Sequence, residues 1–572
     1  GRAAGRYDAD VSRWTLAWVL AGEWTPAAVT GYDAAHPGRH FQGGRLLAMA
    51  DGSAMDGWLA ARCDELADDE VRRFNALRPI AYASVPALDP LRHAAGSDAA
   101  SLDPGLVRAT DANPAGWFAS YDVFPDQPDF AALDPADARA RSAEGRSSTF
   151  GYLRDLQRHH ADLPLLVAAY GVPSSRGLTR LGPQGWTRGG LDEAAQAAID
   201  ARLTREIRAS GCAGGVLFAW MDDWSARDPE VRDLEVPSER SRLWHNAMDP
   251  AQHFGVLALD AGAEEAHPVL GGNAARWAAL PLLARAGSAT AAAGAPIGIG
   301  VGSDAAYVYL AIRLGRASAR AFDRESLGVC LALDTFRADL GQRTLPGGLA
   351  TGDIGFEFVA DFAGPGRAEL RVTPDYNPYV GPREAGAGEG RDPFHRVPVI
   401  TADRDDGAFD SLLAIAGPVR PDRGGALRPA GWVDRGRLRF GTERQSTLSD
   451  WCFDRAAGLL EVRLPWLLIN VTDPSSQSVL WREHADGEFG TAAGDGFRIG
   501  VVTYRRGVHP QPVGSLPALG PGRRWRAADF PTWTWTAWEA PEFHRRLKPV
   551  YLALKQTWGS MPENLATDGG AH

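Results

Sequence analysis

The chain has 572 residues, of which 45% are hydrophobic, so it is too long for one ordinary core and predicts two or more globular units. Its 71 acidic and 60 basic residues give a formal net charge of -11, which argues against nucleic acid or an anionic membrane as the partner. No apolar run reaches the roughly 20 residues that a membrane-spanning helix needs, so we expect no membrane insertion.

The cysteines give no sign of a metal or redox motif. Cys63, Cys212, Cys330 and Cys452 lie far apart and form no CxxC pair, so we expect no zinc motif, no disulfide framework and no cofactor. No charged segment followed by an apolar segment comes after Gly1, so the sequence leaves the compartment open, with a secreted or periplasmic location favoured.

The first 255 residues contain short apolar runs that end in acidic or aromatic residues. These runs lie at 13–24, 78–90, 116–130, 163–171 and 214–224. Between them, apolar residues recur every three or four positions over 56–76, 147–160 and 191–210, which is typical of helices. This alternation of strand and helix predicts a parallel sheet covered by helices.

The residues that follow these runs are ones that a packed core would not select. They are Glu23, Asp89, Asp122, Asp126, Asp222 and Asp223, with Trp24, Tyr121, Trp220 and Trp224 beside them. In a β/α barrel the carboxyl ends of the strands meet at one mouth, where the active site lies. A single acid at a strand end is often a plain loop residue, so the prediction of a site depends on the whole set.

The second half has a different pattern. Residues 277–302 are rich in alanine and glycine and are typical of a linker or an edge. Beyond them, alternating polar and apolar residues predict an antiparallel β-sandwich, in runs at 305–315, 328–336, 355–362, 368–374, 459–469 and 496–505. We therefore predict a barrel domain over 1–255, a connecting segment over 256–302, a sandwich over 303–530 and a tail over 531–572. In the tail, a tryptophan strip (Trp533, Trp535, Trp538) precedes a predicted helix from about Pro541 that packs back on the rest.

The strand phrases resemble one enzyme family. The first part resembles the later strands of the (β/α)8 barrel of retaining glycoside hydrolases of the clan that includes family 2, in a bacterial branch where a β-sandwich follows the barrel. The matching phrases are GEW at 22–24, PALDP at 86–90, SYDVFP at 120–125, AAYGVPSSRG at 168–177 and FAWMDDW at 218–224. The resemblance implies a TIM barrel whose strands one to three are not in this chain. The second half resembles family 9 carbohydrate-binding or DOMON-like modules. The alternative is a sandwich that only braces the barrel.

The resemblance also implies roles for single residues. Glu23 matches the general acid/base, and a carboxyl partly covered by Trp24 would have its pKa raised by desolvation. The other residues of the expected substrate site are Asp89, Tyr121, Asp122, Tyr170, Trp220, Asp222, Asp223 and Trp224. Indole rings stack on the C–H faces of sugars while carboxylates bind the hydroxyls.

The nucleophile of the family is the exception. Its position in the phrase AEYG corresponds to Ala169, and a methyl group cannot form a glycosyl ester. Either the chain is catalytically disabled, or Asp222 or Asp223 acts instead, or this strand is aligned wrongly by some residues. The sequence thus predicts a glycoside hydrolase-like protein that acts on or binds an oligo- or polysaccharide. The alternative is an inactive carbohydrate-binding or scaffold protein.

We interpret the pair His159 and His160, which lies on a predicted helix, as a surface feature.

Overall fold

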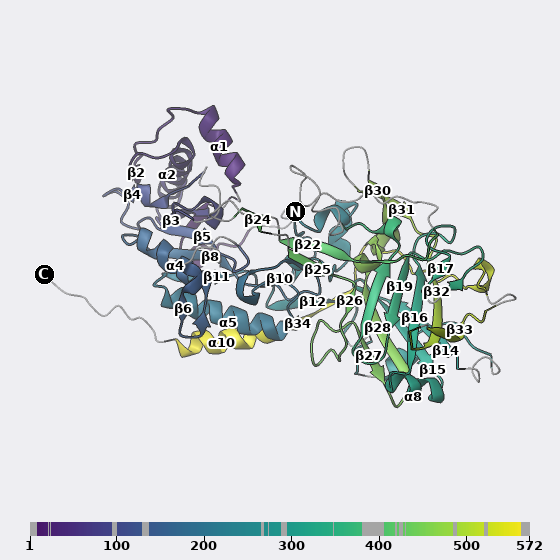
Figure 1. The fold of residues 1–572 in the computed structure, drawn as a ribbon. Helices are drawn as coiled ribbons and strands as arrows, with labels where there is room; N and C mark the ends of the chain where they lie inside the picture. The colour runs from purple at the N-terminus through teal and green to yellow at the C-terminus, as the bar shows by residue number, and fades with distance from the viewer. Residues whose placement is uncertain are drawn as a thin grey trace.

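The computed structural model shows an α/β first part followed by a β-rich second part (Figure 1). It describes residues 8–20, 22, 24–93, 100–127, 136–264, 268–272, 274–287, 294–346, 348–379, 405–417, 420–421, 427–428, 431–483, 489–508, 510–519 and 524–561. The expected acid/base Glu23 lies outside these residues.

A five-stranded parallel sheet organises the first part. Its strand order, β1-β3-β5-β8-β11, is the order along the chain, and each neighbouring pair is parallel. The strands are β1 (Trp18–Leu20), β3 (Ile80–Ser84), β5 (Ala119–Asp122), β8 (Leu165–Tyr170) and β11 (Gly214–Leu217). Each lies inside one of the predicted apolar runs. The sheet is curled, so the prediction of a barrel is confirmed as far as a partial, barrel-like α/β region.

The predicted helices are also confirmed. They are α2 (Ala54–Phe74), α4 (Ser148–His159) and α5 (Glu193–Ala209), and α1 (Pro26–Ala35) precedes them. Each begins at a side chain that accepts a hydrogen bond from a free backbone N–H: Thr25, Ser53, Ser147 and Asp192. Ser53 forms a capping box with Asp56.

These helices cover one face of the sheet. Tyr82 packs with residues of α2, and Tyr121, Val167 and Tyr170 pack with residues of α4 and α5. Asp122 alternates with Tyr121 along β5. The register of β5 and β8 shifts between Tyr121 and Asp122, so Ala169 pairs with Asp122 although Val167 and Tyr170 both pack with the helices. Asp122 and Ala169 therefore lie on the face that these helices do not cover. Short antiparallel pairs complete the first part: β2 (Leu47–Met49) with β4 (Val107–Ala109), β6 (Arg141–Ser142) with β7 (Gly145–Arg146), and β9 (Leu178–Arg180) with β10 (Arg188–Gly189).

Two larger antiparallel sheets form the second part. The first has the order β13-β14-β15-β28-β27, with β13 (Leu282–Arg285), β14 (Pro296–Ser303), β15 (Tyr307–Leu314), β27 (Trp451–Asp454) and β28 (Leu459–Pro465). The second has the order β21-β20-β19-β16-β32-β33, with β26 also on β20. Its strands are β16 (Leu327–Asp334), β19 (Phe358–Phe362), β20 (Ala368–Val372), β21 (Asp410–Ser411), β26 (Arg437–Leu438), β32 (Arg498–Arg505) and β33 (Gln511–Leu516).

Both sheets contribute alternate side chains to one hydrophobic core, for example Leu310 and Val462 from the first and Leu331 and Val501 from the second. The predicted antiparallel β structure is therefore confirmed. Smaller elements are α6 (Ala274–Ala279), α8 (Arg316–Asp323), β17 (Thr344–Leu345), β18 (Leu349–Ala350), β22 (Leu413–Gly417), β23 (Arg420–Pro421), β24 (Leu427–Arg428), β25 (Gly431–Asp434), β29 (Val471–Asp473), β30 (Ser478–Glu483) and β31 (Phe489–Ala493).

The segment expected to be a linker or an edge takes part in the first of these sheets. Residues 277–302 contain β13, which is its edge strand, and most of β14, which lies beside it. Glycines alternate with Ile299 and Val301 in β14, and these two side chains are fully buried. A composition rich in small residues is thus compatible with a strand, because Ile299 and Val301 both pack in the core.

The tail returns to the first part of the molecule. Strand β34 (Phe543–Leu547) pairs with β12 (Leu257–Ala261), and α10 (Pro549–Ser560) packs on α5, as Figure 1 shows in yellow. The helix begins at Pro549 and not near Pro541, because β12 holds the intervening residues extended. Trp533 and Trp535 pack on Trp466, which assigns them to the core of the second part. In the described part of the chain, no helix is long and apolar enough to cross a membrane.

Candidate functional site

The carboxyl ends of the parallel strands lie along one edge of the sheet, where the sequence predicted a site. At the first of these ends, the Trp24 ring stands edge-on to Trp58 of α2, with ring centroids 5.8 Å apart. At the second, buried Asp89 accepts hydrogen bonds from the Tyr152 hydroxyl at 2.7 Å and the backbone N–H of Leu91, and pairs with His93 at 2.8 Å. Asp89 thus joins the end of β3 to α4.

The end of β5 carries Tyr121 and Asp122, which point to opposite faces. Tyr121 is fully buried among the helices, and its hydroxyl lies 2.9 Å from His160 Nε2. Burial, reinforced by the charge of Asp89, raises the pKa of Tyr121 well above its usual value. Asp122 is half-buried on the face that the helices leave uncovered.

Ala169 lies beside Asp122, since the two residues are register partners across β5 and β8. Its neighbour Tyr170 points the other way, and the Tyr170 hydroxyl lies 2.7 Å from the Thr204 hydroxyl of α5. Burial raises the pKa of Tyr170 to about 12. The strand end that should carry a nucleophile therefore presents a methyl group next to one carboxyl group.

Asp126, which follows β5, is a second buried acid at this edge. Neither of its carboxyl oxygens has a hydrogen-bond partner among the described residues, and the nearest cation is Arg188, 3.9 Å away. Burial raises the pKa of Asp126 in spite of the charges of Arg188 and Arg180. Arg188 itself is held by Asp228, in the loop after β11.

The two tryptophans expected to form a sugar platform have different environments. Trp220 is 63% exposed, whereas Trp224 is 5% exposed and stacks on His245, with ring centroids 5.2 Å apart and planes 3° from parallel. Trp224 Nε1 donates to the Leu259 carbonyl at 3.1 Å. The observed role of Trp224 is therefore packing, while Trp220 is accessible to a ligand.

The two acids between these tryptophans also differ. Asp223 is exposed and accepts hydrogen bonds from Ser225. Asp222 is buried and pairs with Lys548 from the tail, with Nζ 2.8 Å from Oδ1. Lys548 Nζ also donates to the Ser174 hydroxyl at 3.2 Å and the His253 carbonyl at 3.1 Å. Burial raises the pKa of Asp222 although Lys548 opposes the shift.

A charged pocket of about 370 Å³ begins at this ion pair. The loops after β8 and β11 contribute Ser174, Arg176 and Asp222, and α5 contributes Glu193. The remaining walls come from the tail and the second part, among them His544, Arg546, Lys548, Asp304, Tyr307, Tyr309, Glu443, Arg444 and Arg463. The pocket thus lies beyond the carboxyl ends of two parallel strands and is closed by segments far along the chain.

Arginine and histidine side chains set the electrostatics of this charged pocket. Arg546 binds both oxygens of Glu193 at 2.7 and 2.8 Å and also Asp260 at 2.8 Å. Burial raises the pKa of Asp260, but the hydrogen bond and charge of Arg546 outweigh it and leave the pKa lowered. His245 and His253 lie side by side, and burial is the main cause that lowers the pKa of each to about 3. Both rings are therefore neutral at pH 7.

The sequence prediction named Asp222 alone among the residues that line the charged pocket. Arg176 lies within the AAYGVPSSRG phrase, and Lys548 is one of the two lysines of the chain. Both residues could therefore have been named as candidate site residues from the sequence. Tyr307 and Arg546 belong to strands that gave no chemical signal. No known protein family and no curated protein matches the chain.

Proposed function

We propose that this protein binds a carbohydrate in the charged pocket, on a scaffold like that of a glycoside hydrolase. The observation that carries the proposal is the position and chemistry of the pocket: about 370 Å³, beyond the ends of β8 and β11, lined by carboxylates, guanidinium groups and two tyrosines. Ligand pockets commonly measure about 300–1,000 Å³, so this one suits a ligand of one or two sugar units.

The tyrosines of β15 supply the aromatic component. Tyr307 lies beneath the Arg463 guanidinium, which is 4.8 Å from the ring centroid, and its hydroxyl has no hydrogen-bond partner among the described residues. Tyr309 donates its hydroxyl to Asp304 at 2.7 Å. An aromatic ring that packs on C–H groups, next to charged groups that bind hydroxyls, is the combination that sugars require.

Binding is better supported than hydrolysis because of Ala169. A retaining glycosidase needs two carboxyl groups about 5 Å apart, one of them a nucleophile. Ala169 supplies no carboxyl, and the carboxylate of Asp222 is engaged by Lys548. The groups that remain around the charged pocket are suited to recognition.

A second candidate is glycoside hydrolysis in which Glu23 acts as the acid and Asp122 replaces the missing nucleophile. The observation that favours it is the register of β5 and β8, which puts Asp122 beside Ala169. Hydrolysis of aryl glycosides by the wild type, lost in both Glu23→Gln and Asp122→Asn, would support this candidate. Activity that both variants retain would exclude these two residues.

The binding proposal is tested with a glycan array, followed by calorimetry on the glycans that bind. Tyr307→Phe removes only one hydroxyl, so affinity should fall about fivefold, which corresponds to the roughly 1 kcal/mol of one hydrogen bond. Arg444→Ala should also weaken binding, because Arg444 is exposed at the pocket. Tyr32→Phe on α1, which does not line the pocket, is the matched control. Glycan binding that is unchanged in Tyr307→Phe and Arg444→Ala would place the ligand elsewhere.

A further inference from the structure

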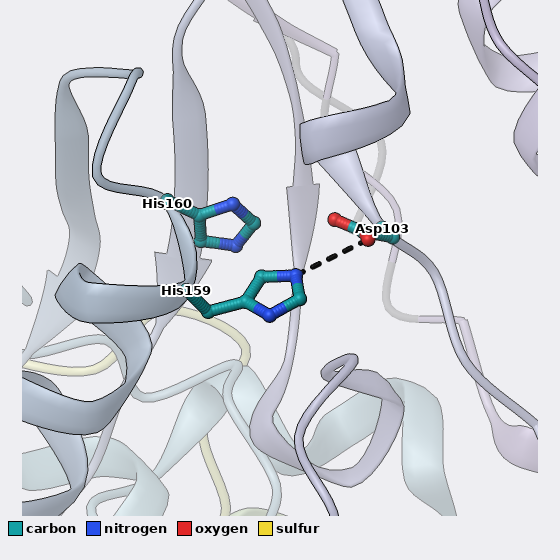
Figure 2. A group of neighbouring side chains, drawn as sticks. All are labelled: Asp103, His159 and His160. Atoms are coloured by element: carbon teal, nitrogen blue, oxygen red, sulfur yellow. Dashed lines mark hydrogen bonds and ion pairs between the residues drawn. The ribbon is translucent and has the colours of Figure 1, made fainter.

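Asp103, His159 and His160 come together at the end of α4, on the helix-covered side of the parallel sheet (Figure 2). His159 is the last residue of α4 and His160 is its C-cap, while Asp103 caps the short 3-10 helix Pro104–Leu106. One potential ligand atom from each of the three side chains lies within 4.8 Å of the other two. This group lies outside the charged pocket.

His160 provides the strongest indication that the group binds something. It is 2% exposed, its Nε2 lies 2.9 Å from the Tyr121 hydroxyl, and its Nδ1 has no hydrogen-bond partner among the described residues. A buried polar atom without a partner is unfavourable, so a ligand at this atom would stabilise it. Gly105 leaves space at this atom, because a Cβ there would stand 3.4 Å from His160 Nδ1 and 2.7 Å from Asp103 Oδ1.

The other two side chains give access from solvent. His159 Nε2 lies 3.2 Å from Asp103 Oδ2, and these side chains are 33% and 19% exposed. The backbone N–H of Gly105 donates to Asp103 Oδ1 at 2.8 Å, which fixes the carboxyl group. An ion could therefore enter from the surface and meet His160 at the buried end.

We propose that Asp103, His159 and His160 bind one divalent transition-metal ion, and that Zn²⁺ is the best match. Two imidazoles and a carboxylate are typical zinc ligands, and solvent would take the fourth position. Bonds of about 2.1 Å hold tetrahedral ligand atoms roughly 3.4 Å apart, so small rotations of the three side chains close the group on an ion.

The surroundings also suit a metal. Tyr121 at His160 Nε2 and the Gly105 N–H at Asp103 are outer contacts of the kind that orient ligands. The ion would join the end of α4 to the 3-10 helix Pro104–Leu106 and stabilise that junction.

The test uses the full chain after dialysis against a chelator, titrated with ZnCl₂ in a calorimeter. The wild type should bind one equivalent and gain thermal stability. His159→Ala and Asp103→Asn should each lower the affinity at least tenfold and remove the thermal shift. The amide introduced by Asp103→Asn keeps an acceptor for the Gly105 N–H, and His159 is partly exposed, so both variants should fold. His40→Ala, at an exposed histidine, is the matched control and should behave like the wild type.

Two results would overturn the proposal. One is a wild type that takes up no stoichiometric Zn²⁺, in which case the group is only an ion pair between Asp103 and His159. The other is one equivalent bound with unchanged affinity by both variants, which would place the ion at other residues. Co²⁺ provides a second readout, since visible absorption bands of a four-coordinate site should appear in the wild type and be absent from His159→Ala.

Discussion

His245 and His253 are two neutral imidazoles buried at the charged pocket. His245 Nε2 lies 3.4 Å from His253 Nδ1, and the His245 ring stacks on Trp224. Protonation would put a charge on a buried ring in a site that already contains Lys548. The pKa of each ring is accordingly lowered to about 3, chiefly by burial.

This shift predicts loss of stability in acid. The folded pKa is below the ordinary value of 6.5, so the unfolded chain binds protons more readily between pH 6.5 and about 3. The stability contributed by the neutral ring is complete above pH 6.5 and falls as the pH decreases through this window. At pH 4 the loss is about 3 kcal/mol for one such group, on the order of 1.4 kcal/mol for each unit of pH.

His245→Phe keeps a ring against Trp224 and removes the titration, so its free energy of unfolding should depend less on pH than that of the wild type between pH 6.5 and 4. Urea unfolding at a series of pH values measures the two slopes. His40→Phe, at an exposed histidine, should keep the wild-type slope. If the free energy of unfolding depended on pH equally in His245→Phe and in the wild type, His245 would not be a source of the acid sensitivity.

At the scale of elements, periodicity was enough to locate most strands and helices. The run at 163–171 predicted β8, and the three- and four-residue spacing over 191–210 predicted α5, because the side of an element that is buried repeats with its geometry. The strand in the tail could not be predicted in this way. The sequence FHRRL gives no apolar alternation, and all five of its residues are only partly buried or exposed, so β34 exists through its pairing with β12.

Helix α10 contacts α5 through one side only. Leu554 is 1% exposed and packs in a cluster with Ala197 and Val550, whereas Leu552 on the same helix is 60% exposed. Leu554→Ala should therefore lower the free energy of unfolding by about 2–4 kcal/mol, since it leaves a cavity. Leu552→Ala, the matched control, should change it by no more than about 0.5 kcal/mol. Equal effects in urea unfolding would show that α10 does not pack on α5 through this side.

At the scale of the whole molecule, buried ion pairs join segments that are distant in sequence. Arg176 after β8 binds both oxygens of Asp450, at 3.0 and 3.2 Å, and Lys548 in the tail binds Asp222. The residues of these pairs are 274 and 326 positions apart. The two parts and the tail are thereby fixed around the charged pocket.

Lys548→Met tests whether the ion pair between Lys548 and Asp222 stabilises the molecule. It leaves the buried carboxyl group of Asp222 without its cation, so the free energy of unfolding should fall by about 3–5 kcal/mol. Lys555→Met is the control, because Lys555, the other lysine of the chain, is exposed on α10. Chemical unfolding of both variants at pH 7 makes the comparison. A loss within about 0.5 kcal/mol for Lys548→Met would mean that Asp222 needs no cation.

The sequence by itself determined the parallel sheet with its helices, the antiparallel second part, and the identity of Ala169 at the end of β8. These features depend on local periodicity and on single residue types, which are readable along one chain. Only the tertiary structure decided that Tyr170 faces α5, that Asp222 pairs with Lys548, and that Asp103 meets His159 and His160. Each of these contacts depends on how separate elements pack, and no local pattern encodes which distant side chain will fill a given space.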